Sequence, residues 1–207
     1  NPYLGIYSKA DGIHLKVIAR ARDSQTAQGL IVPVEQAIHE RLGEYIWGYD
    51  DDTPSQSAGR SLIEKGLSVA VIEMCTGGAL TNSITDVPES VSYFKGGTVA
   101  YDEASLQTYG VPADVMKQNG VVSQQSANAM ADTVRRNLNA DLGVAVTGVP
   151  GPGEFEGKPL GLAYICVTNG EQTREMEMRL PPRRVTIKRR VPNQALIELR
   201  RLIEITG

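Results

Sequence analysis

The segment Glu73-Met-Cys-Thr-Gly-Gly78 carries the residue types best suited to chemistry, and it joins an apolar run to a predicted helix. In open α/β sheets, ligands bind beyond the carboxyl ends of the strands. A turn at Gly77 and Gly78 would let backbone N–H groups approach an anion, and the start of a helix favours negative charge. A helix start can also lower the pKa of a thiol such as Cys75, but no histidine follows to act as its base, which favours a buried thiol. The segment is either an anion-binding loop or a tight turn that binds nothing.

The glycine- and proline-rich segment from Gly148 to Pro159 follows another apolar run. Connections between elements have a median length of about 4–6 residues, and longer loops at strand ends are more often functional. Its spacing matches neither a P-loop nor the dinucleotide-binding fingerprint. Lys158 within it could hold a phosphate or simply be solvated. A third segment, Phe94 to Tyr101, ends in a hydroxyl that could face the same site, although a place at the rim is the simpler interpretation.

Composition and charge limit the partners of the chain. The 207 residues have a net charge of −3, so the overall charge does not favour nucleic acid or an anionic membrane. The basic stretch Arg183–Arg190 could meet RNA or a phosphate, but it lacks interleaved aromatic residues, which favours a solvated helix face or an acidic partner. No apolar run approaches the about 20 residues of a membrane-spanning helix.

Two cysteines, Cys75 and Cys166, suit a reducing cytoplasm, where we expect the protein. His14 and His39 lack metal-ligand spacing, so we expect no metal.

Alternating strands and helices from residue 55 onward must position these segments. Apolar runs predict strands at 67–72, 97–101, 142–147, 160–168 and 172–180, the last two joined by a turn at Asn169-Gly170. Helices are predicted at 55–65, 76–86, 103–109, 113–119 and 123–138, with a final helix that begins near Pro192. We therefore expect an α/β domain, a three-layer α/β/α sandwich around a mixed sheet.

Residues 1–48 show a different pattern. Strands are predicted on both sides of the turn Ala10-Asp-Gly12, followed by a helix over 24–42 that Ser24 caps and Gly43 ends, and by a short strand at 45–47. This is a small α+β (ββαβ) domain. Residues 49–54 are a linker, because three consecutive acids are poor sheet material and Thr53-Pro54 is a good helix start. A second domain is expected over 55–207.

Six blocks in residues 55–205 occur in one order and at spacings typical of a single family. They are Glu73-x-Cys-Thr-Gly-Gly78, Tyr93-Phe-x-Gly-Gly-x-Val-Ala-Tyr101, Gly110-Val-Pro112, Gly120-x-Val-Ser123, Thr147-Gly-x-x-Gly-Pro-Gly153 and Lys158-Pro-x-Gly161. Together they resemble the competence/damage-inducible CinA family, specifically its C-terminal nicotinamide mononucleotide deamidase domain of the PncC type. Residues 1–48 are similar to the KH-like middle domain of full-length CinA proteins. The family's larger, molybdopterin-binding-like N-terminal domain has no counterpart here, and with no initiating Met we expect a piece of a longer protein.

The resemblance implies hydrolysis of the carboxamide of nicotinamide mononucleotide to the nicotinate form plus ammonia, without a metal or cofactor. In such a reaction a serine attacks the amide carbon, a buried neutral lysine takes its proton, and nearby donors hold the oxyanion. The resemblance also implies a homo-oligomer. It assigns catalysis to Thr76 and Tyr101 and substrate binding to Glu73, Cys75, Gly77, Gly78, Gly97, Thr147, Gly148, Gly151, Pro152, Gly153 and Lys158.

Both side chains that the family uses for the reaction are replaced. Met74 stands at the serine position, and Ser105 stands at the lysine position in a segment that is one residue shorter. A thioether cannot attack an amide. One hypothesis is an enzyme with rearranged chemistry. Its nucleophile would be Thr76, Cys75 or Ser105, and its base Lys158 or Lys95.

The other hypothesis is a non-catalytic relative that keeps the nucleotide-binding frame and serves as a binding or assembly module. The retained glycine loops favour a surviving nucleotide site, and the two replacements argue against the ordinary deamidation. RNA binding through residues 1–48 is disfavoured, because they lack the Gly-x-x-Gly loop that clamps a nucleic-acid backbone.

Overall fold

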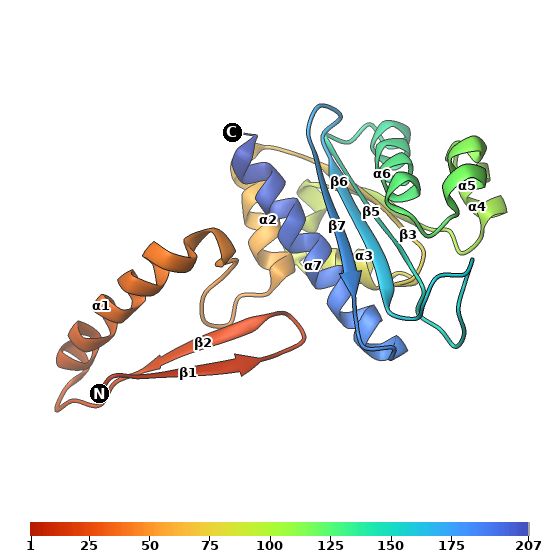
Figure 1. The fold of residues 1–207 in the computed structure, drawn as a ribbon. Helices are drawn as coiled ribbons and strands as arrows, with labels where there is room; N and C mark the ends of the chain where they lie inside the picture. The colour runs from red at the N-terminus through yellow and green to blue at the C-terminus, as the bar shows by residue number, and fades with distance from the viewer. Residues whose placement is uncertain (207) are drawn as a thin grey trace. The chain divides into compact units, whose positions relative to one another are not determined.

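The computed structural model of the chain describes residues 1–206 in two compact units, one comprising Asn1–Asp52 and one beginning at Thr53 (Figure 1). In the first unit, β1 (Tyr3–Ser8) and β2 (Ile13–Ile18) form an antiparallel hairpin, and α1 (Ser24–Leu42) follows. The carboxylate of Asp23, rather than Ser24, caps this helix by accepting a hydrogen bond from the Thr26 N–H at 2.8 Å.

The short strand predicted at residues 45–47 is wrong. Gly43 keeps a right-handed backbone, with φ of −50°, and its N–H donates to the carbonyl of His39. The chain therefore continues from α1 into a 3-10 helix, η1 (Gly43–Tyr45), instead of turning back into a strand. The described residues of the first unit thus form a ββα arrangement with a two-stranded sheet.

The second unit is built on a five-stranded sheet with the order β4-β3-β5-β6-β7. The first three neighbours, β4 (Phe94–Val99), β3 (Val69–Glu73) and β5 (Leu142–Gly148), run parallel. The others, β6 (Leu162–Thr168) and β7 (Thr173–Arg179), add two antiparallel pairings, so the predicted mixed sheet is confirmed. Every residue of β3 and β5 is buried, as central strands covered on both faces require.

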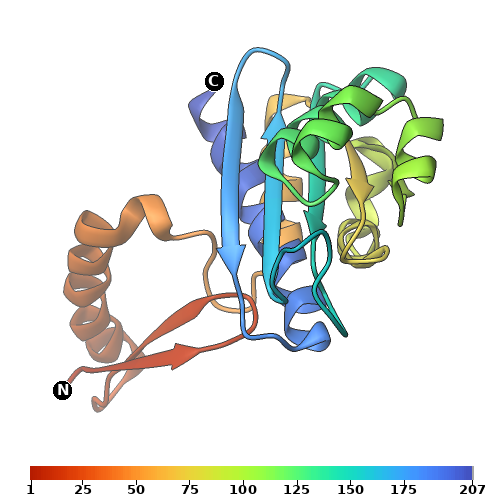
Figure 2. The ribbon, with the colours of Figure 1, turned by 45° about the vertical axis from the view of Figure 1, so that its right-hand side comes forward.

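Helices cover both faces of this sheet, which confirms the predicted three layers (Figures 1 and 2). One face carries α2 (Pro54–Lys65), α3 (Ala79–Thr85) and α7 (Arg184–Ile205). The other carries α4 (Glu103–Thr108), α5 (Ala113–Asn119) and α6 (Gln124–Asn137). Alternation along β3 divides its side chains between two cores, since Val69 and Val71 join the first and Ala70 and Ile72 the second.

The final helix, α7, begins at Arg184, well before the start predicted at Pro192. A proline inside a helix removes one backbone hydrogen bond and so disfavours the helix. Here burial outweighs that cost, because Ile187 and Val191 before the proline and Leu196 after it pack into one core. As a consequence, most of the basic stretch lies on a helix rather than in a loop.

Two further boundaries differ from the prediction. The helix α3 begins at Ala79 instead of Thr76, because Gly77 and Gly78 have left-handed backbones. The strand β4 ends at Val99, so Tyr101 lies just beyond the strand. Across residues 1–206, no helix combines the length and the apolar character that crossing a bilayer requires.

Candidate functional site

The carboxylate of Glu73 organises the turn that follows β3, and it is fully buried. It accepts hydrogen bonds from the N–H groups of Gly78, Leu80 and Thr81 at 3.1, 3.0 and 2.7 Å. The hydroxyls of Thr76 and Thr81 also donate to it, each at 2.6 Å. The N–H groups at a helix start have no partner within the helix and favour negative charge. The anion held by this turn is therefore the chain's own Glu73.

The two glycines of this turn allow its sharp change of direction. Gly77 and Gly78 have φ of +61° and +93°, values that glycine adopts without steric cost. The neighbouring Cys75 and Thr76 are buried. Burial raises the pKa of the Cys75 thiol to about 12, and the nearby Glu73 carboxylate adds to the rise. The thiol is thus protonated near neutral pH and the Thr76 hydroxyl is committed to Glu73.

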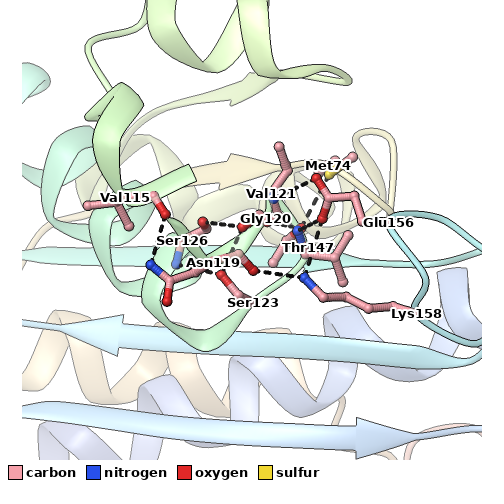
Figure 3. Close-up of polar contacts among 11 residues, drawn as sticks. Met74, Val115, Asn119, Gly120, Val121, Ser123, Ser126, Thr147, Glu156 and Lys158 are labelled. Carbon is pink, nitrogen blue, oxygen red and sulfur yellow. Dashed lines mark hydrogen bonds and ion pairs between the residues drawn. The ribbon is translucent and has the colours of Figure 1, made fainter. Parts of the chain in front are cut away.

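Met74, which the family resemblance places at the serine position, is buried, with 6% of its surface exposed. The hydroxyl of Thr147, near the end of β5, lies 3.0 Å from the Val121 carbonyl and 3.2 Å from the Met74 Sδ, and these two acceptors share its single proton (Figure 3). A thioether accepts weak hydrogen bonds and has no proton to lose. The structure therefore places the Thr147 hydroxyl against the sulfur of Met74, which cannot attack an amide.

A second cluster joins Tyr101 to α7 and was not foreseen from the sequence. The Arg184 guanidinium donates to the Tyr101 hydroxyl at 2.7 Å and to the Gly151 carbonyl at 3.0 Å. One turn further along α7 lies Lys188. A methyl group placed on Gly77 would lie 3.6 Å from the Lys188 Nζ and 3.9 Å from Cε2 of Tyr101. Residues from all three predicted loops thus gather around two cations.

These two cations lack a carboxylate partner among the described residues. Tyr101 is half exposed, so its ring and its hydroxyl remain within reach of a ligand. The sequence contained a signal for this cluster, because positions 184 and 188 are four apart and share one face of a helix. That signal depends on recognising that the helix begins before Pro192.

A third cluster contains Lys158, a predicted substrate-binding residue, and Glu156, for which the sequence predicted no role (Figure 3). The Lys158 Nζ donates to the Asn119 carbonyl at 2.9 Å and to the Glu156 carboxylate at 3.3 Å. That carboxylate also accepts from the N–H groups of Val121 and Val122, at 2.8 and 3.1 Å. The glycine-rich loop is thereby fastened to the turn between α5 and α6.

The remaining predicted residues lie in packing or surface positions. A side chain on Gly97 would come within 2.7 Å of Val71, and one on Gly148 within 2.7 Å of the Leu162 carbonyl, so both glycines permit close packing. Pro152 and Gly153 are exposed.

The two remaining candidates for the rearranged chemistry lie on β4 and α4. Ser105 lies in the first turn of α4, where its N–H donates to the Asp102 carboxylate at 2.7 Å. Lys95 is exposed on β4. Within residues 1–206, no group of three or more His, Cys, Asp or Glu side chains could hold a metal ion.

Two family models match this chain. Residues 51–203 match the CinA C-terminal domain, and residues 1–48 match the damage-inducible protein CinA KH domain. A competence-damage inducible protein from Desulforudis audaxviator is 38% identical over 198 residues, which is 95% of this chain and 48% of the relative. One from Moorella thermoacetica is 41% identical over 169 residues, 81% of this chain and 41% of the relative. The chain spans about half the length, or less, of these curated relatives.

Solved structures share the fold. A CinA superfamily protein from Klebsiella pneumoniae matches with a TM-score of 0.71 over 73% of this chain and 96% of that chain, at 21% identity. The competence/damage inducible protein CihA from Agrobacterium tumefaciens matches with a TM-score of 0.67 over 77% of this chain and 100% of that chain, at 27% identity.

Proposed function

We propose that this chain, which belongs to the CinA family of competence/damage-inducible proteins, binds a phosphorylated nicotinamide nucleotide without hydrolysing its carboxamide. The observation that carries the proposal is the contact between Met74 and Thr147. A buried thioether takes the place of the serine, and it accepts a hydrogen bond from Thr147 at 3.2 Å. Acyl transfer needs a nucleophile that can form a covalent bond to the amide carbon, and this position has none.

Neighbouring side chains do not supply a replacement nucleophile. The Thr76 hydroxyl is fully buried and donates to Glu73, which fixes the turn. Burial raises the pKa of the Cys75 thiol to about 12, so the thiol stays protonated near neutral pH and is a poor nucleophile. Lys158, a candidate base, is engaged with Asn119 and Glu156.

Arg184 and Lys188 support binding of a phosphorylated ligand. Guanidinium groups bind phosphate oxygens through charge-assisted hydrogen bonds. Two neutral acceptors, the Tyr101 hydroxyl and the Gly151 carbonyl, orient Arg184 and leave its charge uncompensated. The exposed ring of Tyr101 offers a face to the positively charged pyridinium of such a nucleotide.

Isothermal calorimetry with nicotinamide mononucleotide tests this proposal. We expect saturable binding to the full chain, and we expect Arg184→Gln and Lys188→Gln each to weaken it at least about tenfold, because a hydrogen bond to a charged group contributes about 1.5–3 kcal/mol. The matched control is Arg189→Gln, which removes an exposed cation of the same helix that forms no contact with Tyr101 or Gly151. Absence of binding, or an equal loss in the control variant, would refute the proposal.

A further inference from the structure

The tip of the glycine-rich loop is a two-residue hairpin turn. One of its two residues is a glutamate whose backbone has a conformation that residues other than glycine rarely adopt. Phe155 and Lys158 form a small antiparallel bridge, with N–H to carbonyl distances of 3.2 and 2.9 Å. Between them, Glu156 and Gly157 have φ of +53° and +68°. Such turns favour Asn or Gly at the first of these positions, so the Glu156 backbone is strained and other contacts must compensate.

The compensation comes from a turn more than 30 residues earlier in the chain. The successive N–H groups of Val121 and Val122 both point to the Glu156 carboxylate, at 2.8 and 3.1 Å. Adjacent backbone N–H groups that converge in this way form an anion-binding nest. Lys158 completes the arrangement with its ammonium group, which contacts Glu156 at 3.3 Å and the Asn119 carbonyl at 2.9 Å.

The same turn is tied to the position of the family nucleophile. Its Gly120 carbonyl accepts from the hydroxyls of Ser123 and Ser126, at 2.9 and 2.7 Å. Its Val121 carbonyl accepts from the Thr147 hydroxyl at 3.0 Å, and that hydroxyl lies 3.2 Å from the Met74 Sδ. Figure 3 shows the resulting continuous series of contacts from Lys158 and Glu156 to Met74.

We propose that Glu156 is a positioning residue whose carboxylate serves as an internal anion. It fastens the glycine-rich loop to the turn between α5 and α6 and, through Val121, holds the Thr147 hydroxyl against residue 74. Lys158 acts with it as the balancing cation rather than as a base. The contacts stand independently of any ligand, and the effect on nucleotide affinity rests on the proposed function.

The charge of Glu156 is maintained near neutral pH. Partial burial tends to raise its pKa, but the hydrogen bonds from Val121 and Val122, helped by Lys158, outweigh burial and hold the pKa below its ordinary value. In the described part of the chain, Lys158 is the charged group that forms an ion pair with it. The internal anion is therefore present at pH 7 and is lost only in acid.

A heteronuclear magnetic resonance titration of the full chain tests the geometry without a ligand. We expect the amide signals of Val121 and Val122 to titrate with a midpoint below the ordinary glutamate pKa, and we expect Glu156→Gln to abolish this titration. The signals of Thr147 and of the Met74 methyl group should shift in the same variant. The matched control is Glu154→Gln, which removes a nearby exposed carboxylate of the same loop and should shift none of them.

Two results would overturn the proposal. If the amides of Val121 and Val122 do not follow the Glu156 titration, the internal anion is not there. If they do, but Thr147 and Met74 keep their signals in Glu156→Gln, the carboxylate only fastens an exposed loop. Lys158→Met provides a second variant, in which the midpoint should rise towards the ordinary value because the cation is gone.

The affinity for nicotinamide mononucleotide separates this inference from the proposed function. We expect Glu156→Gln to weaken binding about tenfold, because the glycine-rich loop would lose the contact that fixes its position, and we expect Glu154→Gln to leave binding unchanged. If the wild-type chain binds no nucleotide while the resonance results hold, the proposed function fails and the positioning role stands. If the wild-type chain binds and Glu156→Gln binds equally well, the positioning role fails.

Discussion

Two turns of the second unit hold a carboxylate against bare backbone N–H groups, and they do so in different ways. After β3, Glu73 accepts from groups no more than eight residues away in the sequence and is fully buried. Between α5 and α6, the carboxylate comes from Glu156, 35 residues from Val121, and its side chain is 28% exposed. The Glu73 carboxylate is thus buried and binds only groups near it in the sequence, whereas the Glu156 carboxylate joins distant segments and stays in contact with solvent.

The two carboxylates therefore differ in what they affect: one contributes to the stability of the fold, and the other sets the position of a loop. A buried carboxylate with five donors is an integral part of the folded turn. Its removal would leave all five donors without a hydrogen-bond acceptor. A partly exposed carboxylate with two N–H donors and one lysine contributes less to folding. It can instead set the position of the loop that carries it. We therefore expect substitutions at the first turn to act on stability and those at the second to act on the site.

The largest effect is expected for Glu73→Gln. The amide group would turn a donor towards groups that are themselves donors, so we expect a loss of about 3 kcal/mol or more in the free energy of unfolding. Urea denaturation of the purified chain measures this loss. A loss below about 1 kcal/mol would mean that the buried carboxylate is not the organising group of the turn.

A smaller effect is expected for Glu156→Gln, a loss of about 1 kcal/mol at pH 7. Because the pKa of Glu156 is lowered in the folded chain, its contribution is fully present above the ordinary value of 4.5 and is lost as the pH falls through the folded value. The stability difference between the wild type and this variant should therefore shrink below pH 4.5. A difference that stays constant down to pH 3 would contradict the assigned role of the charge.

A stability effect of similar size, about 1 kcal/mol, is expected for Gly77→Ala, because alanine is strained at a positive φ. Gly66→Ala is its matched control, since Gly66 has a similar φ of +64° at the end of α2 and open space around it. Both variants should lose similar stability in urea. Only Gly77→Ala should weaken nucleotide binding, because its new methyl group would lie beside Lys188 and Tyr101.

The layered fold of the second unit was predictable because its signals are local. Apolar runs mark the central strands β3 and β5, and the helix predicted over 55–65 ends at Lys65, where Gly66 caps it. The wrong start predicted for α7 came from tertiary packing. Pro192 predicts a helix start by its intrinsic preference, but a buried face on both sides of it carries α7 through the proline.

The site was less predictable for two physical reasons. Arg184 reaches Tyr101 across 83 positions of sequence, and no local pattern reports such a contact. Glu156 accepts hydrogen bonds from the backbone N–H groups of Val121 and Val122. Because every residue other than proline has such a group, these two residue types give no sign of the contact. By contrast, the hypothesis that Met74 stands at the family's serine position comes from the motif alone, and the structure adds that its sulfur contacts Thr147.

Incubation of the full chain with nicotinamide mononucleotide, followed by measurement of ammonia, decides whether this member of the CinA family lacks the nucleophile for deamidation. If the nucleophile is absent, ammonia should form only at the rate of the protein-free solution. Release that rises with protein concentration, saturates with nucleotide and yields equal amounts of nicotinate mononucleotide and ammonia would contradict this expectation.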